Sequence, residues 1–434
     1  MYRTGHWVKH RSRAWLILGM LLIACRVQGA ETGKNGHELK PSVVHAAMER
    51  GLVVLRSGVD NYPNNQHCFS CHHQTLPLLA FSSVFSKSGG MGLGYGGMGG
   101  AMASIPRLEP VRTKDIVQFT TESFKPIIPE LRRGDEIDGK AQTVGYGLWT
   151  YSLAKEPRNE VTDALIENLV RTQRPEGHWD FHSPRPPASS STHMATALAL
   201  LGIQDYGNDV IDSDKRFEIE ARATLWLVNA TAPVSTEDIV GSLWCNYLLR
   251  YHLRAVVRIV NFRQRRGTSV SLREPTISVM DRKWAAREID AGSRLRVAQQ
   301  SNRFFGSQQL QVIQREDGGW GQELDMPSDA YATGQSLWMM GRVQETYKNP
   351  IEREPHIRKG IEFLIKNQQE DGSWHVVKRA IPVQPFFDNG DPHGADQFIS
   401  IMATSWATAA LANYLNANPE TFDAPAEIQQ PSSK

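Results

Sequence analysis

The chain has 434 residues, of which 40% are hydrophobic and 22% are charged, and its formal net charge is +2. This balance is typical of a folded chain that buries a large core, and so small a net charge offers no general attraction for nucleic acid. A chain of this length can form two domains, or one domain that is built from repeats.

The amino-terminal segment has the pattern of an export signal. Four basic residues precede an apolar run from Ala14 to Ala24, which is too short to cross a bilayer as a mature helix. Cleavage could follow the small and apolar residues of Val27–Gly29, whereas Leu22–Cys25 is similar to a bacterial lipobox and would leave Cys25 lipidated. We therefore expect residues 1–30 to be a signal peptide, 31–42 to be a linker, and the protein to be exported, periplasmic or secreted, with a lipid anchor if Cys25 is modified.

The most specific chemical signal is Cys-Phe-Ser-Cys-His at Cys68–His72. Two thiols at this spacing can form thioether bonds to a haem while the adjacent imidazole binds the iron, so the pattern predicts haem c held by Cys68, Cys71 and His72. The same spacing fits a zinc site with Cys68, Cys71, His72 and His73 as ligands. Inert cysteines are a third interpretation, although a disulfide across so short a loop would be strained.

Export and haem c support each other, because covalent haem attachment in bacteria takes place outside the cytoplasm. A haem iron would need a second axial ligand or an open position for a small molecule. Met91, Met98 and Met102, in or just after the glycine-rich stretch Gly89–Gly100, could supply a thioether. The same stretch is also compatible with a surface loop whose methionines bind nothing.

Three later segments share the pattern Gln-x-x-x-Gly-x-Trp, with a leucine four residues before the glutamine. They are Leu169–Trp179, Leu310–Trp320 and Leu364–Trp374. Residues four apart share a helix face, and glycine permits the left-handed backbone that ends a helix. Each segment therefore predicts the end of an outer helix and a Gly–Trp turn, followed by an inner helix that begins with small residues, in an array or closed ring of helix pairs.

The same alternation extends to weaker segments of the chain. Residues 43–57 and 75–85 are expected to form the first outer and inner helices, and Gln142–Leu153 and Ile239–Leu249 two further inner helices. The segment at about 254–292 departs from the pattern, and the surrounding 250–303 is strongly basic. We interpret that region as a solvated insertion, or else as a surface for an anionic partner or lipid. The polar stretch 417–434 is expected to be a loose tail.

The repeat resembles a known family. Lys359–Leu364, followed by Gln368 and Gly372–Trp374, is similar to the QW motif of squalene and oxidosqualene cyclases, whose α/α toroid is shared with protein prenyltransferases. The resemblance covers most of residues 45 to 415. It implies an all-α fold, an α/α toroid over residues 43–416, in which inner and outer rings of helices surround a cavity.

The resemblance does not carry the cyclase activity with it. Class II terpenoid cyclases use an Asp-x-Asp-Asp acid, and this sequence has no such tetrad. Whether the protein is an enzyme therefore stays open, because one fold hosts many functions. An apolar or isoprenoid small molecule in the cavity is implied by the family alone, and the inner-helix tryptophans Trp149, Trp244, Trp338 and Trp406 could line it or simply form the core.

Aligning the repeats places the Cys68–His72 motif at the amino end of the first inner helix, near the cavity rim. In this alignment Cys71 stands level with Asp329 of another repeat, and His72 stands level with His193. Protein prenyltransferases hold zinc through Asp, Cys and His near this rim, so Asp329 and His193 are weak catalytic candidates, with helix capping or core hydrogen bonding as the alternative. The helix dipole is expected to lower the pKa of Cys71.

Three hypotheses follow from these patterns. The first is an exported toroid with a haem c or metal centre at the rim, which performs redox or metal-assisted chemistry on an apolar substrate. The second is a non-catalytic haem carrier with a redox partner, or a ligand-binding toroid. The third is a zinc-dependent prenyltransferase-like enzyme or a terpenoid cyclase.

Overall fold

The computed structural model describes residues 39–85, 113–181, 185–253, 308–347, 355–382 and 385–417. Within these ranges the chain is mostly helical, and its strands form one short antiparallel pair, β1 (Trp320–Gly321) and β2 (Ser328–Asp329). The all-α class expected from the sequence is confirmed for this part of the chain. The expected signal peptide with Cys25, the methionines at 91–102, the segment 254–292 and the tail beyond residue 417 lie outside the described residues.

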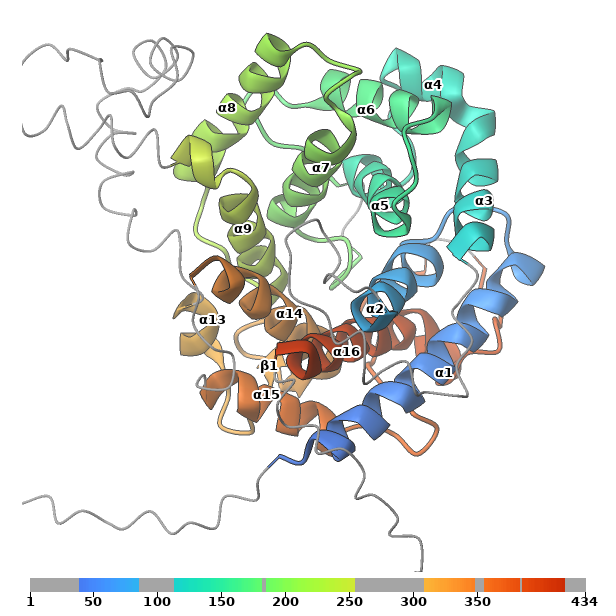
Figure 1. Cartoon of the computed structure of the whole chain (residues 1–434), viewed down its shortest axis with the longest axis vertical. Coiled ribbons are helices and arrows are strands. Elements are labelled where there is room, and N and C mark those ends of the chain that lie inside the picture. The colour runs from blue at the N-terminus through green and yellow to red at the C-terminus, as the bar shows by residue number, and fades with distance from the viewer. Residues whose placement is uncertain are drawn as a thin grey trace, which may run out of the picture. The chain divides into compact units, whose positions relative to one another are not determined.

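Six helices contact one another in a closed cycle (Figure 1). In order around the cycle they are α2 (Leu76–Phe85), α5 (Lys140–Ala154), α7 (Thr192–Tyr206), α9 (Thr236–Leu248), α14 (Ala330–Tyr347) and α16 (Gln397–Ala417), and α16 contacts α2. These helices are apolar on nearly every face, which is the pattern of helices that are buried all round. Small residues let them approach closely, since a Cβ at Gly241 of α9 would lie 2.4 Å from the backbone nitrogen of Met194 in α7.

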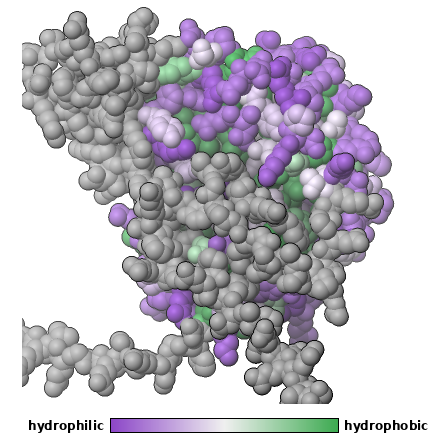
Figure 2. Space-filling model, viewed as in Figure 1, coloured by the Kyte–Doolittle hydropathy of each residue, from purple (hydrophilic) through white to green (hydrophobic). Residues whose placement is uncertain are grey.

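The other helices pack on the outside of this cycle. They are α1 (Pro41–Asn65), α3 (Thr113–Phe124), α4 (Ile128–Arg133), α6 (Glu160–Thr172), α8 (Ser213–Asn229), α13 (Gln308–Ile313) and α15 (Pro355–Lys366). Helix α1 contacts α2 and α16, α6 contacts α5 and α7, and α15 contacts α14 and α16. Their apolar residues face the inner helices, and hydrophilic residues predominate where these helices reach the surface drawn in Figure 2.

The three Gln–Gly–Trp segments form matching turns. In each, the indole N–H donates to the carbonyl of the leucine ten residues earlier, at 2.8 Å, and the glutamine amide donates to the carbonyl of the glycine. The three glycines, Gly177, Gly318 and Gly372, have φ values of +108°, +87° and +92°. Each segment ends a helix, as predicted, but the helix stops before the glutamine, at Thr172, Ile313 and Lys366, and the left-handed glycine lies five or six residues later in the turn that follows.

Each turn is also attached to another outer helix through the second hydrogen bond of its glutamine. Gln173 donates to Ile219 of α8 at 3.0 Å, Gln314 to His356 of α15 at 2.8 Å, and Gln368 to Ala47 of α1 at 2.8 Å. The last of these joins the final repeat to the first described helix. The turns therefore stop the outer helices and set the order in which those helices lie side by side.

The first helix pair is close to its prediction. Helix α1 runs from Pro41 to Asn65, longer than the predicted 43–57, and α2 begins at Leu76 after a π-helical turn at Cys71–Thr75. Two short 3₁₀ helices lie at Lys125–Ile127 and Gly394–Asp396. Within the described ranges, the stretch Gly394–Ala417 is long and apolar enough to cross a bilayer, but 83% of its most apolar window is buried inside the protein, as in a core helix.

Candidate functional site

The Cys68–His73 segment connects α1 to α2 and enters α2 through the π-helical turn. Gln74 stabilises this entry, because its Oε1 accepts from the backbone nitrogen of Ser70 at 2.7 Å, and the amide is buried. Gln74 is therefore a structural residue rather than a ligand. A π-turn leaves the i→i−4 hydrogen-bond ladder irregular, and such turns are frequent at functional sites.

Both cysteines of the motif are free thiols. Cys68 is exposed, and its Sγ lies 3.5 Å from the hydroxyl of Tyr62 in α1. Cys71 is half-buried, and its burial raises the pKa of its thiol to about 12. The expectation that the helix dipole lowers the pKa of Cys71 is therefore wrong, since the cost of desolvating a thiolate exceeds the attraction of the helix end.

His72 is half-buried and lies among other rings. Its ring centroid is 4.8 Å from that of His73 and 5.2 Å from that of Phe398. Its Nδ1 lies 3.8 Å from the sulfur of Cys71, and its Nε2 has no hydrogen-bond partner among the described residues. Burial, followed by the charges of His73 and Arg185, lowers the pKa of His72 well below its ordinary value. The imidazole is thus neutral near pH 7 and has a free nitrogen lone pair, as a metal ligand requires.

His73 makes a buried pair with Asp391, a residue that comes from the loop before α16. The distance from His73 Nε2 to Asp391 Oδ2 is 2.8 Å, and both side chains are at most 1% exposed. The ring stacks on Tyr62 at 4.4 Å, and its Nδ1 lies 3.5 Å from the hydroxyl of Ser70. Burial lowers the pKa of His73 although the hydrogen bond to Asp391 raises it. The neutral tautomer with its proton on Nε2 satisfies both contacts.

These contacts engage both ring nitrogens of His73 within the protein. A zinc ion held by Cys68, Cys71, His72 and His73 would have to break the pair with Asp391. Among the residues that the structure describes, no group of three His, Cys, Asp or Glu side chains is arranged to hold a metal ion. The geometry therefore does not support zinc held by these four residues, whereas haem attachment needs only His72 on the iron, because the thiols would bond to the porphyrin.

The two distant candidates are not brought to the motif as ligands. Asp329 Oδ1 accepts from the backbone nitrogen of Ala332 at 2.9 Å and so caps α14. Burial raises the pKa of Asp329 to about 6. His193 is buried in α7, where its Nδ1 lies 3.6 Å from Asp238 Oδ1 and its ring packs against Trp226. In the structure Asp329 therefore acts as a helix cap and His193 as a core residue, which were the alternative roles expected for them.

The amino ends of the inner helices meet near the motif. Arg185 and Glu237 lie close enough to Cys71 for their charges to act on its pKa, in opposite directions and after the larger effect of burial. Tyr331 at the start of α14 is buried in the same neighbourhood and feels the charge of Glu237 and, more weakly, that of Cys71. The motif therefore opens onto a polar rim that belongs to several helices.

Below this rim, four tryptophans occupy the space between the inner helices. Trp149, Trp244, Trp338 and Trp406 are at most 1% exposed, and their ring centroids lie 5.0 to 6.2 Å apart. Among the residues that the structure describes, none of the four indole nitrogens has a hydrogen-bond partner. The rings pack against one another in edge-on and tilted arrangements, which are the favoured geometries for aromatic pairs. All four belong to the hydrophobic core of the described residues.

Sequence reasoning did not find Asp391 or Glu237 as members of the rim. The pairing of Asp391 with His73 spans 318 positions. Nothing in the local sequence of either residue signals such a partner. No family model matches this chain, and no match was found among curated proteins.

Proposed function

We propose that this protein is an exported redox protein in which Cys68 and Cys71 hold a haem c and His72 binds its iron. The proposal rests on the covalent and protonation states of these three side chains and on their closeness. Two unpaired thiols and a neutral imidazole with a free Nε2 lie within one turn at the entry to α2. Residue types and spacing suit thioether attachment, and the neutral imidazole of His72 suits axial ligation.

The residues around this turn have separable roles. Asp391 fixes His73, and His73 and Phe398 pack against the ring of His72, which limits the directions in which that ring can point. Tyr62 holds Cys68 at the end of α1. A bound haem would supply one-electron transfer at the rim. The neighbouring charge of Arg185 would act on that centre as it acts on Cys71.

The scaffold that we propose is an α/α toroid related to squalene cyclases. The closed cycle of six inner helices, the outer helices packed on it and the three Gln–Gly–Trp turns support this assignment. Cyclisation is not part of the proposal, because the acidic tetrad is absent and the four tryptophans fill the centre. For the same reason we do not propose an isoprenoid substrate inside the ring, and a redox partner that docks at the rim fits better.

The proposal is tested with protein exported from a strain that matures c-type cytochromes. We expect a Soret band that stays with the polypeptide after denaturation, and haem-dependent peroxidase staining of the chain on a denaturing gel. Cys68→Ala and Cys71→Ala should remove the covalent haem. Cys245→Ala is the matched control, because this free cysteine is buried in α9 away from the motif, and the variant should keep the haem.

Zinc is the alternative that this experiment separates from haem. Colourless protein that carries one equivalent of zinc, lost on mutation of Cys68 or Cys71, would refute the haem proposal. Removal of the amino-terminal segment in the exported protein, read from its intact mass, would test export, and an added lipid mass on Cys25 would identify the anchor.

A further inference from the structure

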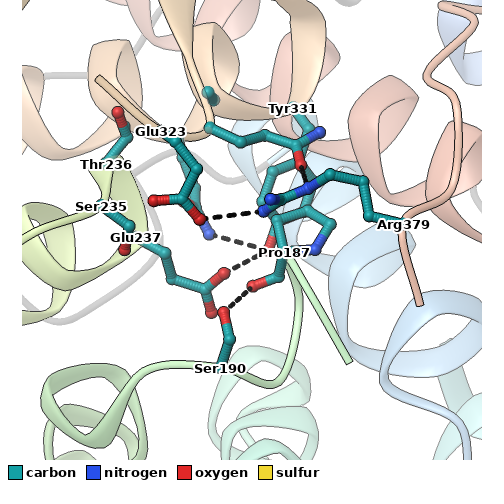
Figure 3. A pocket seen from close by; sticks show the side chains of 11 residues that line it. Pro187, Ser190, Ser235, Thr236, Glu237, Glu323, Tyr331 and Arg379 are labelled. Carbon is teal, nitrogen blue, oxygen red and sulfur yellow. Dashed lines mark hydrogen bonds and ion pairs between the residues drawn. The ribbon is translucent and has the colours of Figure 1, made fainter. Parts of the chain in front are cut away.

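A small polar pocket lies at the rim, formed by the starts of α9 and α14 and by the loops beside them (Figure 3). Its cavity volume is about 10 Å³, which is room for about one water-sized group. Its lining includes Ser190, Thr236, Glu237, Gln335 and Arg379. None of these residues belongs to the proposed haem ligands.

Glu237 is the unusual member of this pocket. Its side chain is buried, with 3% of the residue exposed. Its Oε2 accepts from the hydroxyl of Tyr331 at 3.2 Å, whereas Oε1 is buried and has no hydrogen-bond partner in the described part of the chain. Among the described residues it forms no ion pair, because Arg379, the cation of the pocket, pairs with Glu323 at 3.1 Å. A buried carboxyl with one unsatisfied oxygen needs a proton or an outside partner.

The oxygens that surround Glu237 are arranged to accept hydrogen bonds. Gln335 is fully buried and donates its amide N–H to Tyr331, which leaves its Oε1 without a partner. The hydroxyls of Ser190 and Thr236 donate to the carbonyls of Pro187 and Gly321, so their oxygens also retain lone pairs. The pocket therefore offers several acceptors and one uncompensated carboxyl.

We propose that this pocket binds a small ammonium cation, such as ammonium itself or a short primary amine, between Glu237 and Gln335. An ammonium group has up to four N–H donors and one positive charge. Its donors would pair with the free acceptors, and its charge would balance the carboxylate of Glu237. The Arg379–Glu323 pair is neutral as a whole and does not oppose a cation. The size of the pocket excludes bulky amines.

Binding of the cation should release a proton. Without a ligand, burial keeps the pKa of Glu237 well above its ordinary value, although the hydrogen bond from Tyr331 opposes this. The charged groups that face it are Asp238, Arg379 and Glu323. Tyr331 is the titratable group that contacts it, and Cys71 and Tyr146 are titratable groups on which its charge acts. A bound cation favours the carboxylate, so the cation replaces the proton and its affinity should rise with pH.

The experiment is calorimetric titration of the full exported protein with methylammonium chloride at constant ionic strength, in two buffers that differ in ionisation enthalpy. We expect binding with proton release, at least about tenfold tighter than for sodium, potassium or tetramethylammonium. Glu237→Gln should weaken binding about tenfold or more and abolish the proton release. Because glutamine resembles the protonated acid, this variant should fold, and circular dichroism checks that it does.

Two further variants complete the test. Glu362→Gln, on the exposed face of α15, is the matched control and should bind as the wild type does. Gln335→Met should weaken binding several-fold while keeping the carboxyl. The proposal is overturned if no ammonium compound binds, if an alkali metal ion binds equally well, or if Glu237→Gln binds unchanged. None of these outcomes depends on whether a haem is present.

Discussion

At Cys71, two effects act on the thiol in opposite directions. The end of a helix favours a thiolate by a fraction of a kcal/mol to about 2 kcal/mol. Burial costs more, although backbone hydrogen bonds to the sulfur oppose it, and it raises the pKa of the thiol to about 12. In the folded chain Cys71 is therefore a poor nucleophile. If a haem is attached here, the thioether bond has to form before this segment folds.

The pair between His73 and Asp391 should be important for stability. Asp391→Ala would leave the buried imidazole without its partner, and we expect a loss of about 3 kcal/mol or more in the free energy of unfolding. Denaturant titration followed by circular dichroism measures this loss. Asp388→Ala, three residues away and exposed, is the control and should change stability by less than about 1 kcal/mol. Equal effects of the two changes would show that the loop, and not the pair, is responsible.

Asp329 should make stability depend on pH. Its pKa is raised by burial from 3.8 to about 6 in the folded protein. A carboxyl with a raised folded pKa favours folding fully below its unfolded pKa, and this contribution is lost as pH rises through the folded pKa. Asp329→Asn keeps a capping side chain without the charge. It should be more stable than the wild type near pH 8 by up to about 3 kcal/mol, and the difference should vanish below pH ~4.

Thermal unfolding of Asp329→Asn and the wild type across this pH range measures the effect. The comparison isolates Asp329, because the other buried groups titrate equally in both proteins. A stability difference that does not change with pH would mean that the charge of Asp329 is compensated in the fold.

At the scale of elements, the repeats were predictable because the residues that form each turn are close together in the sequence. The glutamine, glycine and tryptophan of one turn satisfy one another over a few residues, so their pattern indicates the turn without knowledge of the fold. The contacts that complete the site have no such local signal. Asp391 meets His73 only because the last inner helix lies beside the first one.

Gly372 should be the most sensitive position of the turn that joins the last repeat to α1. Its φ is +92°, and a Cβ there would lie 2.6 Å from the carbonyl oxygen of Arg50. Gly372→Ala should therefore destabilise the protein by about 2 kcal/mol or more, through backbone strain and the displacement of α1. Gly341→Ala in α14 is the opposite case, because no atom of the described residues lies within 4 Å of the added Cβ, and it should stabilise by roughly 0.5–1 kcal/mol. Chemical denaturation of both variants tests the contrast, which an equal response would refute.

At the scale of the whole molecule, the closed cycle of inner helices has a packed centre and a polar rim. The sequence predicted helix pairs and an apolar interior, but it could not predict whether the tryptophans line a cavity or fill it. That depends on the distance between helices that meet only when the cycle closes. The indoles fill the centre, so the buried polar groups with unmet hydrogen bonds at Glu237 and Gln335 lie at the rim, where the Cys68–His73 segment also lies.

The contrast between the packed apolar centre and the polar rim predicts how the protein responds to apolar ligands. Trp338 contacts the other three indoles of the centre, so Trp338→Ala should cost about 3–5 kcal/mol and leave a cavity in the position of the ring. Added indole should then raise the melting temperature of the variant, because a ligand that binds only the folded state stabilises it. The wild type should not respond, since its centre is already filled. An increase of the wild-type melting temperature with indole or a short isoprenoid alcohol would mean that the centre opens to apolar molecules, and it would restore the cavity-binding hypothesis in place of the packed core.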